Sequence, residues 1–422
     1  MTRLFTLLAL CLAVVACTKK DPTYCAMHPE DTANCAPPDG AGACTSDPDC
    51  AGDSTAPVCD TGRGICVQCI APDKTSACWD TAPVCGDDNL CHACTAHSEC
   101  ASGACLPDGA CADESDVAYV SPTGTDNTSC TQAMPCTSVE DALATDRPII
   151  KLSGTLDEGA TIIVDRTVTF LAEPGAQLTR TSNGVILEIR STGTVAIRDL
   201  EITGGSGAGG VGISIPAGNA PNVSLTRVKV TNNQGGGISA SGGSLTVAQS
   251  TLSGNQGGGI SVSGVGATFD ITNNMITRNG DRINGAFGGL NLGIAMAGSN
   301  RLEFNTIVDN VAAINSGGVV CNVAAFTGPN NIIARNEVTG STTMPNAQTQ
   351  GACQYPTSII QNDVAGLGFE DPEAPPPISY KLTSGSSAID AATTPSSVAV
   401  DIDGDARPQG AEKDIGADEY RP

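Results

Sequence analysis

Aromatic residues are scarce in this chain, and their scarcity narrows the folds that are open to it. Phe, Trp and Tyr make up 3% of its 422 residues, with a single tryptophan, whereas glycine occurs 49 times. A conventional globule buries large aromatic side chains in its core. The composition therefore favours a turn-rich β architecture with an aliphatic core.

Basic residues are also few, since 21 Lys and Arg stand against 45 Asp and Glu, which gives a formal net charge of −24. Binding to nucleic-acid phosphates depends on clustered Lys and Arg, so this balance argues against a nucleic-acid partner. We interpret the acidic surface as a solubility feature, with divalent cations as a minor class of partner.

Long apolar runs are missing apart from one, at residues 4–16. That run is too short to span a bilayer and is typical of an export signal. It ends in the letters LAVVAC, which resemble a bacterial lipobox with Cys17 as the lipidated first residue; an ordinary secretory signal is the alternative. We expect a signal peptide over 1–16, a lipid on Cys17 that anchors the chain to a membrane, and a tether over 17–43. The expected location is the outer membrane or cell surface of a Gram-negative bacterium.

Twelve of the 20 cysteines lie between residues 44 and 111, in three groups of four. Cys66-Val-Gln-Cys69 and Cys91-His-Ala-Cys94 have the spacing of zinc ligands, but a zinc site would leave eight cysteines of the segment unexplained. In an exported chain we favour disulfides, paired inside each group. Four cysteines allow three connectivities, and all three stay open. We predict disulfide-rich repeats over 44–112.

A repeat organises the rest of the chain. Thr231-Asn-Asn-Gln-Gly-Gly-Gly-Ile-Ser returns 22 residues later as Ser253-Gly-Asn-Gln-Gly-Gly-Gly-Ile-Ser. Alternating apolar residues between these turns predict short strands with one face inward. Strands this short bury that face only by stacking coil upon coil, as in a solenoid. The Gly-rich turns and the lack of a 3.6-residue period argue against a helical solenoid.

The repeat makes specific packing predictions. Val230, Leu252 and Ile276 hold the same place in successive coils, so they should form an inward stack, whereas Gln249 and Ser253 should lie at outward or turn positions. A short helix at 138–144 should cap the first coil. An internal ladder is expected from one column of asparagines, near positions 232–233, 255, 279, 310 and 336.

Two further disulfides are predicted in this part of the chain. Cys130 and Cys136 flank a short loop, and Cys321 and Cys353 lie about one coil apart. Adjacent rungs of a parallel sheet are spaced closely enough for a disulfide.

Residues 117–337 resemble a right-handed parallel β-helix of the pectate-lyase-like group. Ala118-Tyr-Val-Ser-Pro-Thr-Gly-Thr-Asp is similar to the usual beginning of such domains. The ending, Asp401-Ile-Asp-Gly-Asp-Ala-Arg-Pro and then Asp414-Ile-Gly-Ala-Asp-Glu-Tyr, resembles the C-terminal signature of surface β-helix proteins of the choice-of-anchor Q type.

The expected fold class is thus all-β, with a disulfide-rich region before a right-handed parallel β-helix. We place the β-helix at 117–374. Residues 375–422, after the Pro375-Pro-Pro break, should form a C-terminal cap that covers the last coil.

Catalytic candidates in the coils are scattered. Enzymes of the pectate-lyase-like group need clustered carboxylates for calcium with an Arg or Lys base, or several close aspartates. No adjacent Asp-Asp pair occurs there, and the histidines, at 28, 92 and 97, all lie outside the solenoid, which excludes a histidine acid or base within it. The candidates are Asp165, Asp199, Glu201, Asp270, Asp281, Glu303, Asp309, Arg198, Arg227, Lys229 and Arg278.

One acidic segment suggests a metal. Asp401, Asp403 and Asp405, with Glu412 in the twelfth position, resemble a calcium loop. The sixth position is Ala406, where an EF-hand has Gly, and Pro408 without flanking helices also departs from the pattern, so we favour a structural turn of the cap, with a calcium site as the alternative. We expect no cofactor, and calcium is the one exception that the sequence leaves open.

We therefore interpret the chain as a surface lipoprotein whose β-helix serves adhesion, or recognition of glycans or neighbouring cells, without catalysis. The alternative is a polysaccharide lyase or glycoside hydrolase of the pectate-lyase-like fold. A structural envelope component without a specific ligand is a third interpretation.

Overall fold

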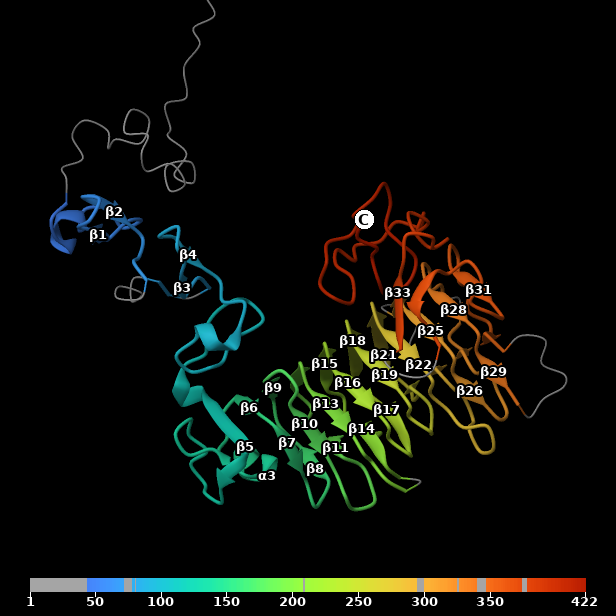
Figure 1. Ribbon diagram of the computed structural model, residues 1–422. Coiled ribbons are helices and arrows are strands. Elements are labelled where there is room, and N and C mark those ends of the chain that lie inside the picture. Colours follow the sequence, from blue (N-terminus) through green and yellow to red (C-terminus); the bar gives the residue numbers. More distant parts are fainter. Residues whose placement is uncertain are drawn as a thin grey trace, which may run out of the picture. The chain divides into compact units, whose positions relative to one another are not determined.

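The computed structural model describes residues 44–422 apart from 72–77, 80, 208, 294–299, 325, 340–346 and 374–377. The predicted signal peptide, Cys17, the tether and the Pro375-Pro-Pro break lie outside the described residues. The chain divides into two compact units, residues 1–112 and 113–422 (Figure 1). Within the described ranges, no helix is long and apolar enough to cross a membrane.

Three small modules make up the described part of the first unit, and each ends in a hairpin. In the first module (44–67), the 3-10 helix η1 (Asp47–Cys50) precedes the antiparallel strands β1 (Val58–Asp60) and β2 (Ile65–Val67). In the second (69–92), β3 (Val84–Cys85) pairs with β4 (Cys91–His92). In the third (94–111), η3 (His97–Glu99) precedes an antiparallel bridge between Cys105 and Cys111.

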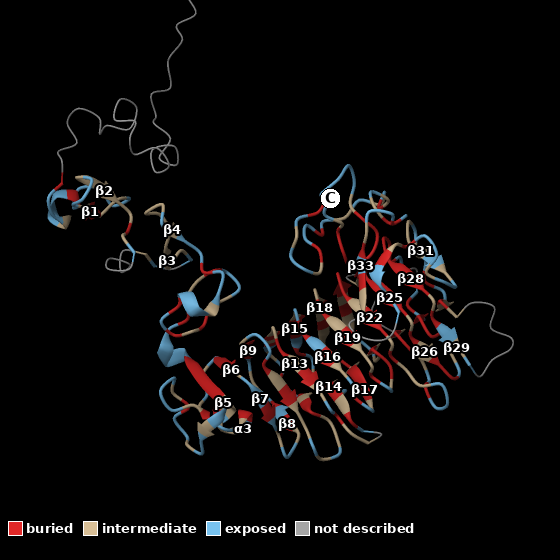
Figure 2. Ribbon diagram, in the orientation of Figure 1, coloured by how far each residue is buried: buried red, intermediate tan, exposed pale blue. Residues whose placement is uncertain are grey.

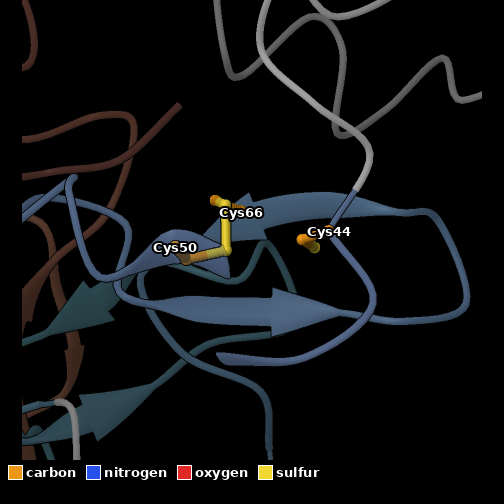
Figure 3. A group of neighbouring side chains, drawn as sticks. All are labelled: Cys44, Cys50 and Cys66. Atoms are coloured by element: carbon orange, nitrogen blue, oxygen red, sulfur yellow. A yellow bond between two sulfur atoms is a disulfide. The ribbon is translucent and has the colours of Figure 1, made fainter. Parts of the chain in front are cut away.

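Every module has the same disulfide connectivity, from its first cysteine to its third and from its second to its fourth. Figure 3 shows one of these bonds, Cys50–Cys66, beside Cys44. Each bond ties the arm before the hairpin to one of the two hairpin strands, and one bond of this kind contributes roughly 2–4 kcal/mol. The bonds are Cys44–Cys59, Cys50–Cys66, Cys69–Cys85, Cys78–Cys91, Cys94–Cys105 and Cys100–Cys111.

An acidic residue before the second cysteine caps the arm in the first and third modules. Asp49 accepts backbone hydrogen bonds from Thr45 (2.7 Å) and Ser46 (3.0 Å). Glu99 accepts from the two corresponding residues of the third module, at 2.6 and 2.9 Å. These backbone bonds hold the pKa of both carboxyl groups below the usual range. The shared cap supports an internal repeat of the modules.

A short helix closes the beginning of the second unit. After η4 (Glu114–Asp116) and β5 (Val117–Thr125), the helix α3 (Val139–Ala144) follows the N-cap Ser138. The Ser138 hydroxyl accepts the backbone N–H of Asp141 at 3.1 Å, and the side chains of Val139 and Ala142 are buried. The helix predicted at 138–144 is confirmed.

Three parallel sheets form the body of the second unit, and the chain visits them in turn, one strand of each per coil (Figure 1). The first sheet contains β5, β6 (Ile149–Leu152), β9 (Val168–Ala172), β12 (Thr194–Arg198), β15 (Asn222–Thr226), β18 (Ser244–Ala248), β21 (Thr268–Thr272) and β24 (Arg301–Glu303). The second contains β7 (Thr155–Asp157), β10 (Gln177–Thr179), β13 (Glu201–Thr203), β16 (Lys229–Thr231), β19 (Thr251–Ser253), β22 (Met275–Thr277), β25 (Thr306–Val308), β28 (Ile332–Ala334) and β31 (Ile359–Gln361).

The third sheet contains β8 (Ile162–Val164), β11 (Leu187–Ile189), β14 (Val211–Ile215), β17 (Gly236–Ala240), β20 (Ile260–Val262), β23 (Leu290–Leu292), β27 (Val319–Cys321) and β30 (Thr349–Gly351). A small parallel pair, β26 (Val311–Ala312) and β29 (Glu337–Val338), lies between the second and third sheets along the chain. The all-β, right-handed parallel β-helix predicted from the sequence is confirmed.

The predicted register holds in the coils of the repeat. Val230 pairs with Leu252, which pairs with Ile276, and all three side chains are fully buried in one aliphatic core (Figure 2). Ser253 is half-buried on the outward face of β19. Gln249 lies at a turn, as predicted, with a φ of +54°. Its side chain is also engaged, because its amide donates to the carbonyl of Asp401 at 2.9 Å.

Buried asparagines form two ladders. In the predicted ladder, each side-chain oxygen accepts the backbone N–H and the side-chain NH₂ of the asparagine one coil earlier, so this prediction is confirmed. Its members are Asn233, Asn255, Asn279, Asn310 and Asn336. A second ladder, which the sequence analysis did not predict, runs between the first and second sheets through Ser250, Asn274, Asn305 and Asn331.

A left-handed residue precedes each ladder position and turns the chain at the corner. Asn232, Arg278 and Asp309 have φ values of +53°, +57° and +61°, directly before Asn233, Asn279 and Asn310. The corner after the first ladder also needs glycine, because coils approach closely there. A Cβ on Gly257 would lie 2.2 Å from the carbonyl oxygen of Gly235.

The C-terminal segment (363–422) lies along the side of the solenoid, whereas the sequence predicts a cap over the last coil. Its strands β32 (Phe369–Asp371) and β33 (Ser379–Leu382) form an antiparallel pair. Its side chains form a second apolar core with outward-facing residues of β25 and β28, among them Val308 and Ile332. The corresponding outward residues of β16 are polar, Lys229 and Thr231. The change from polar to apolar outward residues explains why the segment packs there.

Replacement of Leu252 tests the register. Leu252→Ala should destabilise the mature chain by about 2–5 kcal/mol, because the neighbouring rungs cannot fill the void. Leu252→Asp should cost more, since the carboxylate has no partner in an aliphatic column. Ser253→Ala, next to it but outward, should change stability by less than about 0.5 kcal/mol. Chemical denaturation followed by circular dichroism measures all three, and equal stability of Leu252→Asp and Ser253→Ala would refute the register.

Candidate functional site

The acidic segment that suggested calcium does form a carboxylate cluster, with a different membership. The structure brings Asp401 and Asp403 together with Asp418, and one carboxylate oxygen of each lies within 4.8 Å of the others. Asp403, Asp405 and Asp418 line one surface cleft, but Asp405 is ion-paired with Arg421. Glu412 lies elsewhere, where its backbone N–H donates to Asp390 at 2.9 Å. Asp418 escaped prediction because it joins the cluster from outside the loop pattern.

Backbone N–H groups already donate to three of the six oxygens of this cluster. Asp401 accepts from Asp403 (2.9 Å), Asp405 (2.8 Å) and Glu419 (3.0 Å). Asp418 accepts from Leu382 at 2.7 Å. Asp401 therefore closes a turn in the way that an Asx turn does.

A lysine supplies the positive charge beside the cluster. The ammonium group of Lys381 lies 2.8 Å from the carboxylate of Asp403, and this hydrogen bond raises the pKa of Lys381. Calcium prefers six to eight oxygen ligands, so an ion at this place would have to compete with Lys381 and with the backbone donors. The three carboxylates could offer a cation at most a partial site.

Burial governs the acid–base behaviour of the C-terminal segment. It raises the pKa of Asp418 to about 6, and it also raises the pKa values of Asp401 and Asp414. Arg407 and Glu419 form a buried ion pair at 2.9 Å. The guanidinium carbon of Arg407 lies 4.7 Å from the centre of the Phe304 ring, a cation–π contact that joins the segment to the solenoid.

Three of the candidate carboxylates on the coils are paired with an arginine of the next coil. Asp199 binds Arg227, Asp270 binds Arg301 and Asp309 binds Arg335, in each case through two N–H···O bonds between consecutive coils. Side-chain bonding to Asp199 raises the pKa of Arg227. These bidentate ion pairs link each coil to the next.

Of the remaining candidates, only Arg278 meets another one, since the Tyr380 hydroxyl to which it donates itself donates to Asp309. Glu201 accepts from Gln177 and Thr231, and Glu303 from Ser396. Asp281 binds backbone N–H groups of its own turn. Arg278 donates to the hydroxyl of Tyr380, Lys229 is exposed on β16, and burial lowers the pKa of Arg198.

Asp165 lies in a cleft of about 590 Å³ between α3 and β8, together with Glu140, Asp146, Glu158 and Arg166. Glu158 accepts the backbone N–H of Val139 at the start of α3 (2.9 Å), and Arg166 donates to the carbonyl of Leu143 near its end (3.3 Å). Burial raises the pKa of Glu158. An anion at the N-terminus and a cation at the C-terminus stabilise a helix, so these two residues hold α3 in place.

The cysteine clusters are disulfides. Three groups of sulfur atoms lie close enough to hold a metal, one in each module. Every one of the twelve cysteines between 44 and 111 is, however, bonded to another cysteine, including Cys66, Cys69, Cys91 and Cys94. In the second unit the structure pairs Cys130 with Cys136 and Cys321 with Cys353, with Cα–Cα distances of 4.8 and 5.8 Å.

Comparison with known proteins adds two similarities. Residues 48–117 match a family of unknown function, DUF8331. The crystal structure of pectate lyase Pel9A is similar at 15% sequence identity and a TM-score of 0.43, over 72% of this chain and 96% of that one. No curated protein matches the chain in sequence.

The raised pKa of Asp418 predicts a pH-dependent stability. The folded state binds this proton more tightly than the unfolded state, whose pKa is near 3.8. The contribution of this proton to the free energy of unfolding is therefore complete below pH 3.8 and is lost as the pH rises through about 6. Asp418→Asn keeps an oxygen for the Leu382 N–H and stays neutral, so it should be more stable than the wild type at pH 8, by up to about 3 kcal/mol.

Denaturation at pH 4.5 and pH 8 measures the difference, which should shrink at the lower pH. Asp371→Asn is the matched control, since it neutralises an exposed carboxylate of β32 and should change stability by less than about 0.5 kcal/mol at either pH. A variant Asp418→Asn that is less stable than the wild type at pH 8 would contradict the assignment.

Proposed function

We propose that this chain is an exported, lipid-anchored surface protein of a Gram-negative bacterium, and that it serves adhesion or the recognition of glycans or neighbouring cells. The membrane is its first partner, through a lipid on Cys17, and the β-helix is the rigid body that it displays. The resemblance of the ending at Asp401 and Asp414 to choice-of-anchor Q proteins is consistent with display at the surface.

Export is supported by the disulfides. Eight disulfides occur among the described residues. Bonds of this kind persist in oxidising compartments and are rare in the cytosol. The apolar run over 4–16 and Cys17 provide the route out of the cytosol and a position for acylation.

The observation that carries the non-catalytic role is the pairing of charged groups on the coils. A glycosidase needs two carboxylates on either side of one bond, and a general acid or base must be able to reach its substrate. Asp199, Asp270 and Asp309 are instead held by arginines of the next coil. Carboxylates that are held in such ion pairs support the interpretation of the β-helix as a non-catalytic scaffold.

The cleft at α3 favours a second candidate, a polysaccharide lyase or glycoside hydrolase. Glu158 has the raised pKa of a general acid, and Arg166 lies in the same cleft. The mature chain should be incubated with pectate and with neutral polysaccharides. Release of new sugar ends that is lost in Glu158→Gln would favour the enzyme over the adhesin.

The anchor is tested by Cys17→Ser. This change removes the acylation position, so the protein should leave the membrane fraction or accumulate as an unprocessed precursor. Cell fractionation and immunoblotting measure the distribution, with the wild-type chain as control. Normal processing and membrane retention of the variant would exclude the lipid anchor.

The role itself is tested on intact cells. Cells that carry the wild-type chain should expose it to added protease and should attach to neighbouring cells or to immobilised glycans more strongly than cells without it. Cells with the Cys17→Ser variant are the matched control for display. Equal attachment of all three strains would leave the structural envelope component as the better interpretation.

A further inference from the structure

The first unit carries a cleft that the proposed function does not use. It has a volume of about 320 Å³ and lies between the first and second modules. Its lining combines apolar and uncharged polar side chains: Ser54, Thr55, Pro57, Gln68, Trp79 and Ala82.

Trp79 is the unusual member of this lining. It is the only tryptophan of the chain, and 60% of its surface is exposed. A large aromatic side chain is normally buried where a core is available. The apolar cluster of the first module is instead made of cysteines, Cys44, Cys50 and Cys59. Trp79 therefore contributes little to the fold for a residue of its size.

The cleft is built on fixed backbone. Trp79 follows Cys78, which is bonded to Cys91, and its carbonyl accepts the N–H of Ala82 at 3.1 Å. Gln68 accepts the N–H of Cys91 through its side-chain oxygen at 2.9 Å. A disulfide and two hydrogen bonds thus hold the aromatic ring and the amide at the same opening.

The polar groups suit a ligand that both donates and accepts hydrogen bonds. The oxygen of the Gln68 amide is used, which leaves its NH₂ group to donate. The Thr55 hydroxyl donates to Asp53 at 2.6 Å, which leaves its oxygen to accept. None of the described residues that line the cleft is charged.

This chemistry excludes the ions that the rest of the chain might attract. A divalent cation needs several oxygen ligands, chiefly carboxylates, and an anion would be repelled by a chain of net charge −24. Sugars present apolar C–H faces and hydroxyl groups, which match an aromatic ring beside an amide and a hydroxyl.

We propose that this cleft binds neutral pyranose units of a glycan, with Trp79 as the stacking platform and Gln68 as a hydrogen-bond donor. The proposal rests on the proposed function, since it names the ligand class for recognition, and it assigns the binding to the disulfide modules. The β-helix then acts as the displayed body that accompanies them.

The single tryptophan makes the test direct, because all tryptophan fluorescence of the chain comes from Trp79. The mature chain should be titrated with cellohexaose, mannohexaose and chitohexaose, and with the anionic hexamer of polygalacturonate. Calorimetry with the same sugars covers the variants Trp79→Ala, Trp79→Phe and Gln68→Ala. Met134→Ala, at an exposed apolar residue of the second unit, is the control.

At least one neutral hexasaccharide should shift the fluorescence saturably, whereas the anionic hexamer should not. Trp79→Ala should weaken its binding by at least about tenfold, Trp79→Phe and Gln68→Ala by less, and Met134→Ala not at all. If a neutral sugar binds without a change in fluorescence, and binds the Trp79→Ala variant as tightly as the wild type, the assignment to this cleft is wrong. Glycan recognition by another part of the chain would then remain the proposed function. Absence of binding to every neutral probe overturns the inference, while attachment of intact cells decides the proposed function independently.

Discussion

Buried asparagine amides set the register of the solenoid, and the rest of the second unit depends on them. An amide removed from water is costly unless its donors and acceptors are satisfied. Asn279 meets this condition through four bonds: its oxygen accepts two N–H groups of Asn255, and its nitrogen donates to Leu252 and to Asn310. A slip by one residue would break all four bonds and would also turn the aliphatic side chains outward.

The ladders decide which surface groups are left for function. Each ladder position follows a left-handed residue, and several of these are charged, namely Arg278, Asp309 and Arg335. Since coils stack in register, a charged corner residue comes to lie near its equivalent on the next coil, where Asp309 meets Arg335. The same repetition that builds the fold therefore pairs its charges. The described residues of the disulfide modules form no ladder of this kind, and there the Gln68 NH₂ group and the Thr55 oxygen keep hydrogen-bonding capacity for the ligand that we propose.

Much of the fold could be predicted from the sequence, because a repeat turns local spacing into three-dimensional stacking. The stack around Leu252, the first asparagine ladder and the helix at 138–144 all followed from periodicity. The second ladder was missed although Asn274, Asn305 and Asn331 repeat at the same separations of 31 and 26 residues as the first ladder in these coils, so periodicity contained a signal for it. The position of the C-terminal segment was missed although the sequence contains a signal for it, the apolar outward residues Val308 and Ile332.

The candidate metal site shows where spacing stops being informative. The loop pattern grouped Asp405 and Glu412 with Asp401, but tertiary contacts replaced both with Asp418. Among the described residues of the segment, four buried acids, Asp401, Asp414, Asp418 and Glu419, surround one buried arginine, Arg407. The excess of carboxyl groups over positive charge is stabilised by eight backbone N–H groups, which donate hydrogen bonds to these side chains. Amide donors stabilise buried carboxylates without a counter-ion, so an acidic signature of this kind can encode a turn-rich structural element as readily as a calcium site.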